Sequence, residues 1–179
     1  KQYVPEYCRI VRVIRDIPAE SIEAGSKASN LRQTIHEEMK KEGLECRCIR
    51  CREIGNAKIT TRNLKLKRLD YDASDGKEIF LSYEDTKHDK LVALLRLRIC
   101  LESRSLNIKN NAIIREVHTY GESVPLFRDR DAKQMQHKGL GKKLVKEAEK
   151  IAKKEFGAKK IAVISGVGVR GYYAKLGYK

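Results

Sequence analysis

The residues that most clearly suggest chemistry form a short glycine-containing segment at 136–144, with the sequence QHKGLGKKL. Its two glycines, two positions apart, let the backbone approach a phosphate closely because no Cβ stands in the way. A helix is expected directly after them, and its first free N–H groups and positive dipole end would face the same anion. The segment predicts a phosphate-binding loop, although glycines before a helix are also ordinary turn residues.

The elements that must position this loop can be read on either side of it. Residues 111–123 are expected to form a strand, and residues 140–156 place apolar side chains at a helical period with lysines on the other face. Residues 160–165 predict a short buried strand. A turn through Gly166 and Gly168 then leads to a second helix, which ends in YYAKLGY at 172–178.

This order of elements, the Q-x-x-G-x-G loop and the Y-x-K-x-G-Y ending resemble the second half of an acetyltransferase domain of the GNAT class. More specifically, the chain resembles the C-terminal acetyltransferase part of the Elongator catalytic subunit, of the archaeal type. The blocks that carry this resemblance run from Arg9 to the last residue and include RVIRDIP at 12–18, REIG at 52–55, LSYED at 81–85, LLRLR at 94–98, EVHTYG at 116–121 and IAVISGVG at 161–168. The resemblance implies an α/β GNAT fold with a mixed, mostly antiparallel central sheet flanked by helices.

The resemblance also implies a function. Proteins of that family carry an N-terminal radical-SAM domain and modify the wobble uridine of tRNA, with acetyl-CoA as the carboxymethyl source. It therefore implies an acyltransferase, a tRNA uridine carboxymethyltransferase, that uses acetyl-CoA and tRNA in the cytoplasm. A radical-SAM cluster needs three spaced thiolates, and the five cysteines show no such spacing at the N-terminal end. We expect the chain to be part of a longer protein whose other half holds the iron–sulfur cluster and S-adenosylmethionine.

In the GNAT resemblance, one strand is splayed from its neighbour and pairs with the pantetheine arm of acetyl-CoA, and the loop holds the pyrophosphate. The residues that this assigns to cofactor binding are Glu116, Val117, His118, Thr119, Gln136, Gly139, Leu140, Gly141, Lys142, Lys143 and Tyr173. Tyr173 is placed near the thioester sulfur, where its phenol could protonate the leaving thiolate, and Tyr172 would pack or assist. The alternative for both tyrosines is a role in the core.

Glu116 and His118 are candidate catalytic residues because side chains two apart on a strand share one face. One could orient the other or activate a water on the acetyl carbonyl. The alternative for His118 is a hydrogen-bonded core histidine, and the family chemistry does not require a base here.

The charge balance indicates a polyanionic partner. The net charge is +15, and residues 27–68 alone carry 12 basic and five acidic side chains. Such a surface would bind nucleic acid with a steep salt dependence, because each neutralised phosphate releases counterions. A solvated charged face is the alternative. With 6% aromatic residues and no Trp, contacts to the RNA backbone are expected rather than base stacking. The candidate RNA-binding residues are Lys27, Arg32, Lys40, Lys41, Arg47, Arg50 and Arg52.

Cys46, Cys48 and Cys51 lie within six positions and predict a metal site. Thiolates this close do not easily form strain-free disulfides, whereas a C-x-C-x-x-C turn can present three sulfurs to one tetrahedral ion. His36, on a helix expected over 29–42 that ends at a glycine, is the favoured fourth ligand, and Cys8 is its rival. We expect a structural zinc that stabilises a segment too short to build a core. Reduced cysteines beside a surface histidine are the alternative, and Cys100 is expected in the core of a strand.

Two domains are expected: residues 1–57, a linker and helical zinc-binding segment that forms the tail of the missing half, and residues 58–179, the GNAT domain. Further strands are expected over 62–71, 78–84 and 90–102, the last adjacent to 111–123, with polar turns at 72–77 and 86–89.

With 179 residues and 41% hydrophobic side chains, the chain can build one substantial core and a small appendage. It contains no apolar run near the ~18 residues that span a bilayer. Its odd number of cysteines argues against a secreted disulfide framework. Two other functions are open: a protein lysine acetyltransferase, which would want an acidic groove for a basic tail, and an RNA-binding module with a vestigial acetyl-CoA site.

Overall fold

The computed structural model describes residues 3–11, 13, 18–25, 27, 30–55, 63–100, 111–120 and 139–179. The chain divides into two compact units, Lys1–Glu53 and Ile54–Lys179. The predicted domain boundary, between residues 57 and 58, lies outside the described residues. None of the described helices is both long enough and apolar enough to cross a membrane.

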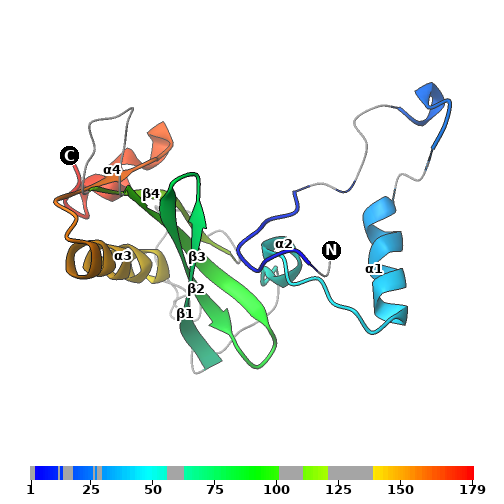
Figure 1. The fold of residues 1–179 in the computed structure, drawn as a ribbon, viewed down its shortest axis with the longest axis horizontal. Helices are drawn as coiled ribbons and strands as arrows, with labels where there is room; N and C mark the ends of the chain where they lie inside the picture. Colours follow the sequence, from blue (N-terminus) through cyan, green and yellow to red (C-terminus); the bar gives the residue numbers. More distant parts are fainter. Residues whose placement is uncertain are drawn as a thin grey trace, which may run out of the picture. The chain divides into compact units, whose positions relative to one another are not determined.

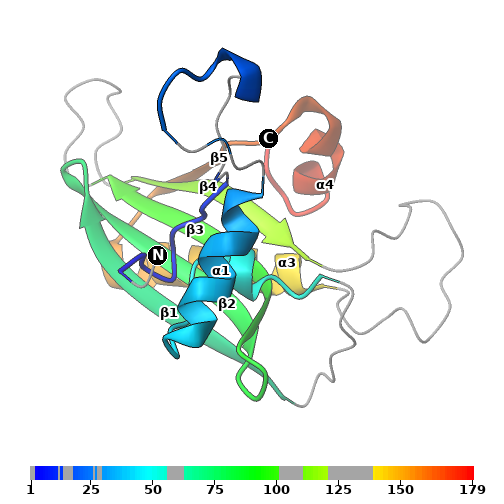
Figure 2. The same ribbon diagram turned by 90° about the vertical axis from the view of Figure 1, so that its right-hand side faces the viewer.

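The second unit is built on a five-stranded sheet with the order β1-β2-β3-β4-β5 (Figures 1 and 2). Its first four strands pair antiparallel, and the last pairs parallel to β4. The sheet is therefore mixed and mostly antiparallel, as predicted, and β3 and β4 are adjacent as expected. The strands are β1 (Leu64–Ala73), β2 (Gly76–Asp85), β3 (Lys90–Cys100), β4 (Asn111–Thr119) and β5 (Lys160–Val163).

The turn between β1 and β2 is shorter than the polar turn predicted at 72–77. Only Ser74 and Asp75 lie outside the strands, with φ of 46° and 58°. Two positive φ angles in succession are what a two-residue hairpin turn of the favoured hand requires. Arg98 stabilises this hairpin by donating hydrogen bonds to the carbonyls of Ala73 and Ser74. The polar residues on either side of the turn therefore continue the strand ladder.

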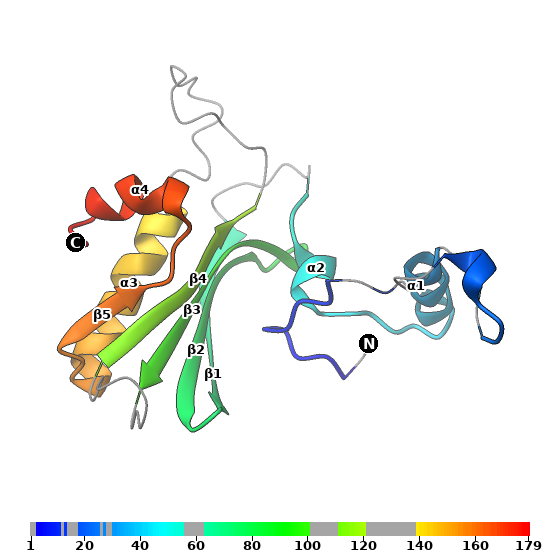
Figure 3. The same cartoon turned by 90° about the horizontal axis from the view of Figure 1, so that it is seen from above.

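Helix α3 (Leu140–Phe156) covers one face of the sheet (Figure 3). Its predicted bounds are confirmed, and so is its apolar stripe, which is buried at Leu140, Leu144, Val145, Ala148, Ile151 and Ala152. This stripe packs in one core with buried side chains of β2, β3 and β4 such as Leu81, Leu95 and Ile114. Each such side chain contributes about 1.5–3 kcal/mol on burial. The core thus fixes where the first turn of α3 lies relative to β4.

A β-bulge in β4 changes which side chains face that core. Arg96 pairs with Glu116 and Leu97 with Ile114, so Arg115 is an extra residue in the strand. Before the bulge Ala112 and Ile114 are in the core, and after it Val117 packs there instead. Because side chains alternate between the two faces, one extra residue reverses the alternation. Odd-numbered residues therefore face the α3 side after Arg115.

The remainder of the second unit follows β5. A 3-10 turn, η4 (Val167–Val169), leads directly into helix α4 (Arg170–Ala174). Tyr173 of α4, together with Leu176 and Tyr178 after it, packs against the core. Cys100, predicted in mid-strand and in the core, is instead the last residue of β3 and is half-buried.

The first unit contains a 3-10 turn, η1 (Ala19–Ser21), and the helices α1 (Leu31–Lys41) and α2 (Ile49–Arg52). Helix α1 confirms the helix expected over 29–42, and Gly43, with φ of 69°, follows its end. Among the described residues of this unit only Cys48, Ile49 and Arg52 are buried. An apolar core of that size does not stabilise a unit of this length by itself.

Candidate functional site

The strands β4 and β5 separate part-way along their length. Their parallel pairing covers only Asn111–Ile114 of β4, and a hydrogen bond of 2.9 Å from the N–H of Ile164 to the carbonyl of Ile114 extends it by one step. Beyond that point the chain turns into η4 and α4, and Figure 3 shows it diverging from β4. Within the described part of the chain, the edge of Arg115–Thr119 that faces β5 has no strand partner.

A cavity of about 490 Å³ lies beside this free edge. It is lined by Val117, Thr119, Gly139, Gly141, Lys142, Val169, Tyr172 and Tyr173. Seven of these eight residues were candidate site residues from the sequence, and the structure brings them together from β4, the start of α3 and α4. The eighth, Val169, was missed, because a valine in a turn carries no signal that separates it from a packing residue.

The start of α3 leaves N–H groups free at this cavity. Gly139 is the N-cap in a left-handed conformation (φ 87°), and its carbonyl accepts the N–H of Lys143 at 2.8 Å. The preceding amides of Leu140, Gly141 and Lys142 have no acceptor within the helix, because the first turn of any α-helix lacks them. The Lys143 amide, which the sequence assigned to the same anion, is therefore engaged within the helix. Gln136 lies outside the described residues.

Tyr172 and Tyr173 form the α4 wall of the cavity, with their ring centroids 5.1 Å apart in an edge-to-face arrangement. Burial raises the pKa of Tyr173 above its usual value. Burial, and then the neighbouring Tyr173, raise the pKa of Tyr172 in the same way. A raised pKa keeps a phenol protonated at neutral pH, so both hydroxyls are proton donors there.

Glu116 and His118 do not line the cavity. The Glu116 carboxylate accepts a hydrogen bond from the Arg96 guanidinium at 2.8 Å, and the exposed His118 ring lies 4.4 Å from the ring of Tyr120. The bulge at Arg115 is the physical reason, because it turns the odd-numbered side chains towards the cavity and the even-numbered ones to the other face. The geometry therefore does not support either side chain as a base acting within this cavity.

In the first unit, the sulfur atoms of Cys46, Cys48 and Cys51 all lie within 4.8 Å of one another. The Nε2 atom of His36, on α1, lies 3.6 Å from the Cys51 sulfur. Cys8 is not part of this group, and its carbonyl accepts the N–H of Ile49 at 2.9 Å. Three thiols and one imidazole at these separations fit a tetrahedral zinc site, and the contact with Cys51 favours His36 over Cys8.

The electrostatics of the three thiols also fit a cation. Burial would raise the pKa of Cys48, but hydrogen bonds from the backbone of Ile10 and Cys51 and from the neighbouring thiols lower it. Burial, followed by Cys48 and Cys46, raises the pKa of Cys51 to about 12. One thiol thus ionises easily and makes the next resist, which a bound cation would reverse.

The candidate RNA-binding side chains divide into two sets. Arg52 is 2% exposed and donates hydrogen bonds to the carbonyls of Arg47 and Glu6, so its placement on an RNA-facing surface is not supported. Arg32 donates to the carbonyl of Ile10, and Arg47 pairs with Glu6. These three arginines stabilise the first unit. The exposed side chains that remain are Lys27, Lys40, Lys41 and Arg50.

A family model described as the acetyltransferase (GNAT) family matches residues 56–178. The chain belongs to the GNAT acetyltransferase family. The family model thus confirms the GNAT fold that was expected from the glycine loop and its flanking elements, and it places β1 to α4 within the GNAT domain.

The more specific resemblance is confirmed as well. The tRNA uridine(34) acetyltransferase of Methanocaldococcus jannaschii is 47% identical over 186 residues, which cover 100% of this chain and 34% of the relative. The Elongator complex protein 3 of Schizosaccharomyces pombe is 47% identical over 182 residues, which cover 98% and 33%. The solved structure of the archaeal Methanocaldococcus infernus Elp3 with an N-terminus deletion (1–46) has a TM-score of 0.86 at 47% identity and covers 100% of this chain and 44% of that one. The chain thus spans about a third of the length of the curated relatives it matches.

Proposed function

We propose that the second unit binds acetyl-CoA in the cavity between β4, α3 and α4 and releases its acetyl group for the modification of a tRNA wobble uridine. The observation that carries this is the meeting of three features in one cavity: a free strand edge after Ile114, free amides at the start of α3, and the protonated phenol of Tyr173. An extended pantetheine arm suits the first, a pyrophosphate the second and a departing thiolate the third.

The residues of the chain would divide the work as follows. The backbone of residues 116–119 pairs with the pantetheine arm, and the amides of Leu140, Gly141 and Lys142 hold the pyrophosphate. When the thioester C–S bond breaks, the Tyr173 hydroxyl donates its proton to the sulfur, which becomes the thiol of CoA. The attacking oxygen comes from water or from an acceptor group. The described side chains of this cavity include no carboxylate or imidazole, so the nucleophile must be activated elsewhere.

The tRNA part of the proposal is supported by the names of the relatives and by charge. Relatives 47% identical over the whole chain are tRNA uridine(34) acetyltransferases, and this chain carries a net charge of +15. The exposed side chains of Lys27, Lys40, Lys41 and Arg50 would contact tRNA phosphates. We propose that a radical-SAM half, in the same longer protein, holds the iron–sulfur cluster and S-adenosylmethionine and receives the acetyl group.

We also propose that His36, Cys46, Cys48 and Cys51 hold one zinc ion. When bound, zinc supplies a closed four-ligand centre that stabilises structure and leaves no position open for substrate. The small apolar core of the first unit supports such a role, since so few of its described residues are buried.

The proposed function can be tested by measuring release of free CoA thiol from acetyl-CoA, with tRNA, with a histone-type peptide, or with neither. We expect tRNA to accelerate thiol release and the peptide to have no effect. Tyr173→Phe should lower the rate by roughly tenfold to a hundredfold without a matching loss of acetyl-CoA affinity, because it removes one proton donor. Tyr178→Phe is a matched control, since its hydroxyl binds Glu149 at 2.8 Å and does not line the cavity.

Other outcomes would separate the alternatives. Acetylation of the peptide, with no effect of tRNA, would favour a protein lysine acetyltransferase. Tight tRNA binding without any binding of acetyl-CoA would favour an RNA-binding module whose acetyl-CoA site is vestigial.

A further inference from the structure

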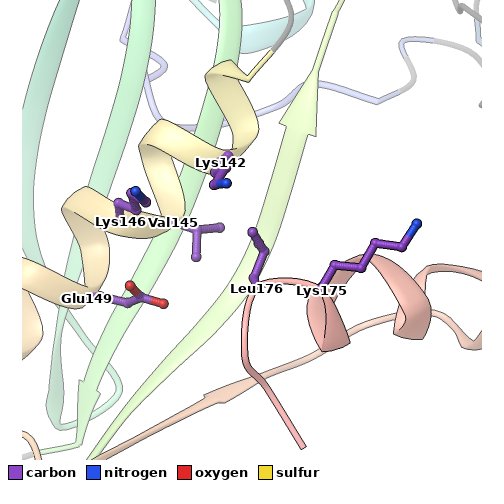
Figure 4. Close-up of a pocket in the computed structure, with 6 residues that line it drawn as sticks. All are labelled: Lys142, Val145, Lys146, Glu149, Lys175 and Leu176. Carbon is purple, nitrogen blue, oxygen red and sulfur yellow. The ribbon is translucent and has the colours of Figure 1, made fainter.

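A second cavity, of about 210 Å³, lies between α3 and the α4 end of the chain (Figure 4). It is lined by Lys142, Val145, Lys146, Glu149, Lys175 and Leu176. Lys142 also lines the larger cavity, so the two cavities adjoin at the first turn of α3. Whatever occupies the larger cavity near the free amides of α3 can therefore extend into the smaller one.

The rim of this second cavity is cationic. Lys142, Lys146 and Lys175 are exposed, and none of them forms an ion pair with another residue that the structure describes. Lys150, one turn further along α3, behaves differently because it pairs with Glu147 at 3.2 Å. The single acidic group of the cavity, Glu149, accepts a hydrogen bond from the Tyr178 hydroxyl at 2.8 Å. Three positive charges thus face one negative charge, which favours an anion there.

The base of the cavity is apolar. Figure 4 shows Val145 and Leu176 between the helix and the C-terminal segment, with the lysines projecting from α3 and α4 around them. Val145 is 1% exposed and Leu176 is half-buried. An apolar base with a cationic rim suits a flat heterocycle that carries a phosphate, because the ring can cover the apolar side chains while the phosphate contacts the ammonium groups.

CoA carries such a group directly beyond its pyrophosphate, namely an adenosine with a phosphate at the ribose 3′ position. We propose that the second cavity holds this 3′-phosphoadenosine end and that Lys146 and Lys175 bind the 3′-phosphate. The proposal rests on the acetyl-CoA site proposed above. A phosphate monoester carries about −1.5 to −2 charges at neutral pH, which matches the charge excess of the rim. The cavity thereby selects CoA over its 3′-dephospho form.

The test is a calorimetric comparison of CoA with 3′-dephospho-CoA on the 179-residue chain. The wild type is expected to bind CoA about tenfold more tightly than dephospho-CoA, since two charge-assisted contacts are at stake. In the double variant Lys146→Gln/Lys175→Gln this preference should fall to about twofold, because CoA binds more weakly while dephospho-CoA binds as before. Glutamine keeps most of each side chain and removes only its charge.

The matched control is Lys154→Gln/Lys159→Gln, which removes two exposed lysines that line neither cavity. This control should keep the preference for CoA. Equal affinity of the wild type for the two ligands, or an unchanged preference in the double variant, would overturn the inference while the proposed function stands. A double variant that loses affinity for tRNA instead would show that these lysines contact nucleic acid, and would also overturn it. No binding of either ligand would refute the proposed function together with this inference.

Discussion

Replacement of Gly141 by alanine is expected to raise stability and lower acetyl-CoA affinity at the same time. A Cβ at this position would lie 3.4 Å from the Tyr172 hydroxyl, 3.7 Å from Thr119 Cγ2 and 3.8 Å from Val117 Cγ1. These are ordinary van der Waals separations, so the methyl group fits the protein without ligand. It nevertheless occupies the wall of the larger cavity, beside the free amides of α3.

The two effects can be given magnitudes. Alanine is favoured over glycine by up to about 1 kcal/mol within a helix, and position 141 is the second residue of α3. A gain of about 0.5 kcal/mol raises the Tm by roughly 1–3 °C in a chain of this size. Loss of one charge-assisted hydrogen bond costs about 1.5–3 kcal/mol, which weakens acetyl-CoA binding by roughly tenfold to a hundredfold. Gly141→Arg should abolish binding, because its longer side chain fills the space of the pyrophosphate.

Gly139→Ala provides the matched control for stability. Gly139 has φ of 87°, and a Cβ there would have no atom within 4 Å, so only backbone strain opposes the change. That strain costs about 1–2 kcal/mol. Urea unfolding should therefore show opposite signs at the two glycines, and calorimetry then separates affinity from stability. Wild-type affinity in Gly141→Ala together with measurable binding by Gly141→Arg would refute the assignment of this cavity to acetyl-CoA.

Three further predictions follow from other parts of the chain. Elemental analysis of protein purified without chelator should find one zinc per chain; Cys48→Ser should destabilise the first unit more than the GNAT domain, and retention of zinc in His36→Ala would show that only the fourth ligand is wrong. Replacing the exposed basic residues by alanine should weaken tRNA binding and reduce the log-log salt slope by roughly 0.7–0.9 per lost phosphate contact, with acetyl-CoA affinity unchanged; an unchanged slope would return them to a solvated surface. The side chains to replace are Lys40, Lys41 and Arg50. The pKa of the buried Asp85 is lowered by its hydrogen bond to His88 and by backbone N–H groups, so its carboxylate stabilises the fold above the unfolded pKa of about 3.9, and this contribution is lost as the pH falls through the lower folded pKa. Asp85→Asn should therefore cost more stability at pH 7 than at pH 3 in urea unfolding, and a pH-independent cost would contradict the assignment.

The elements that could be predicted from sequence are those whose signals are local. Helix α3 was predicted with its bounds because an apolar stripe of the right period lies between Gly139 and Gly157, and both glycines adopt left-handed conformations. The cysteine group was predicted because its three members lie on one turn. The approach of His36 to Cys51 depends on the chain folding back after Gly43, which the glycine signalled but did not specify.

The features that could not be predicted depend on partners distant in sequence. Arg52 belongs to a basic run, yet it is buried because the carbonyl of Glu6, 46 positions earlier, accepts its hydrogen bond. Glu116 and His118 were placed correctly on one face of a strand, but the sequence gives no sign of the extra residue at Arg115. Without a glycine to mark it, the bulge could not be read, and the face was assigned without knowing which side the cavity would be on.

The bulge at Arg115 has a consequence for how the strand tolerates substitution. Arg115 is exposed and its guanidinium reaches the buried carboxylate of Glu78, which also accepts a bond from Arg98. Across β4, a saturation library should show sensitivity at every second position, even-numbered up to Ile114 and odd-numbered from Val117. Such a phase slip records the two tasks of one strand: its first half is read by the interior of the protein and its second half by whatever enters from outside.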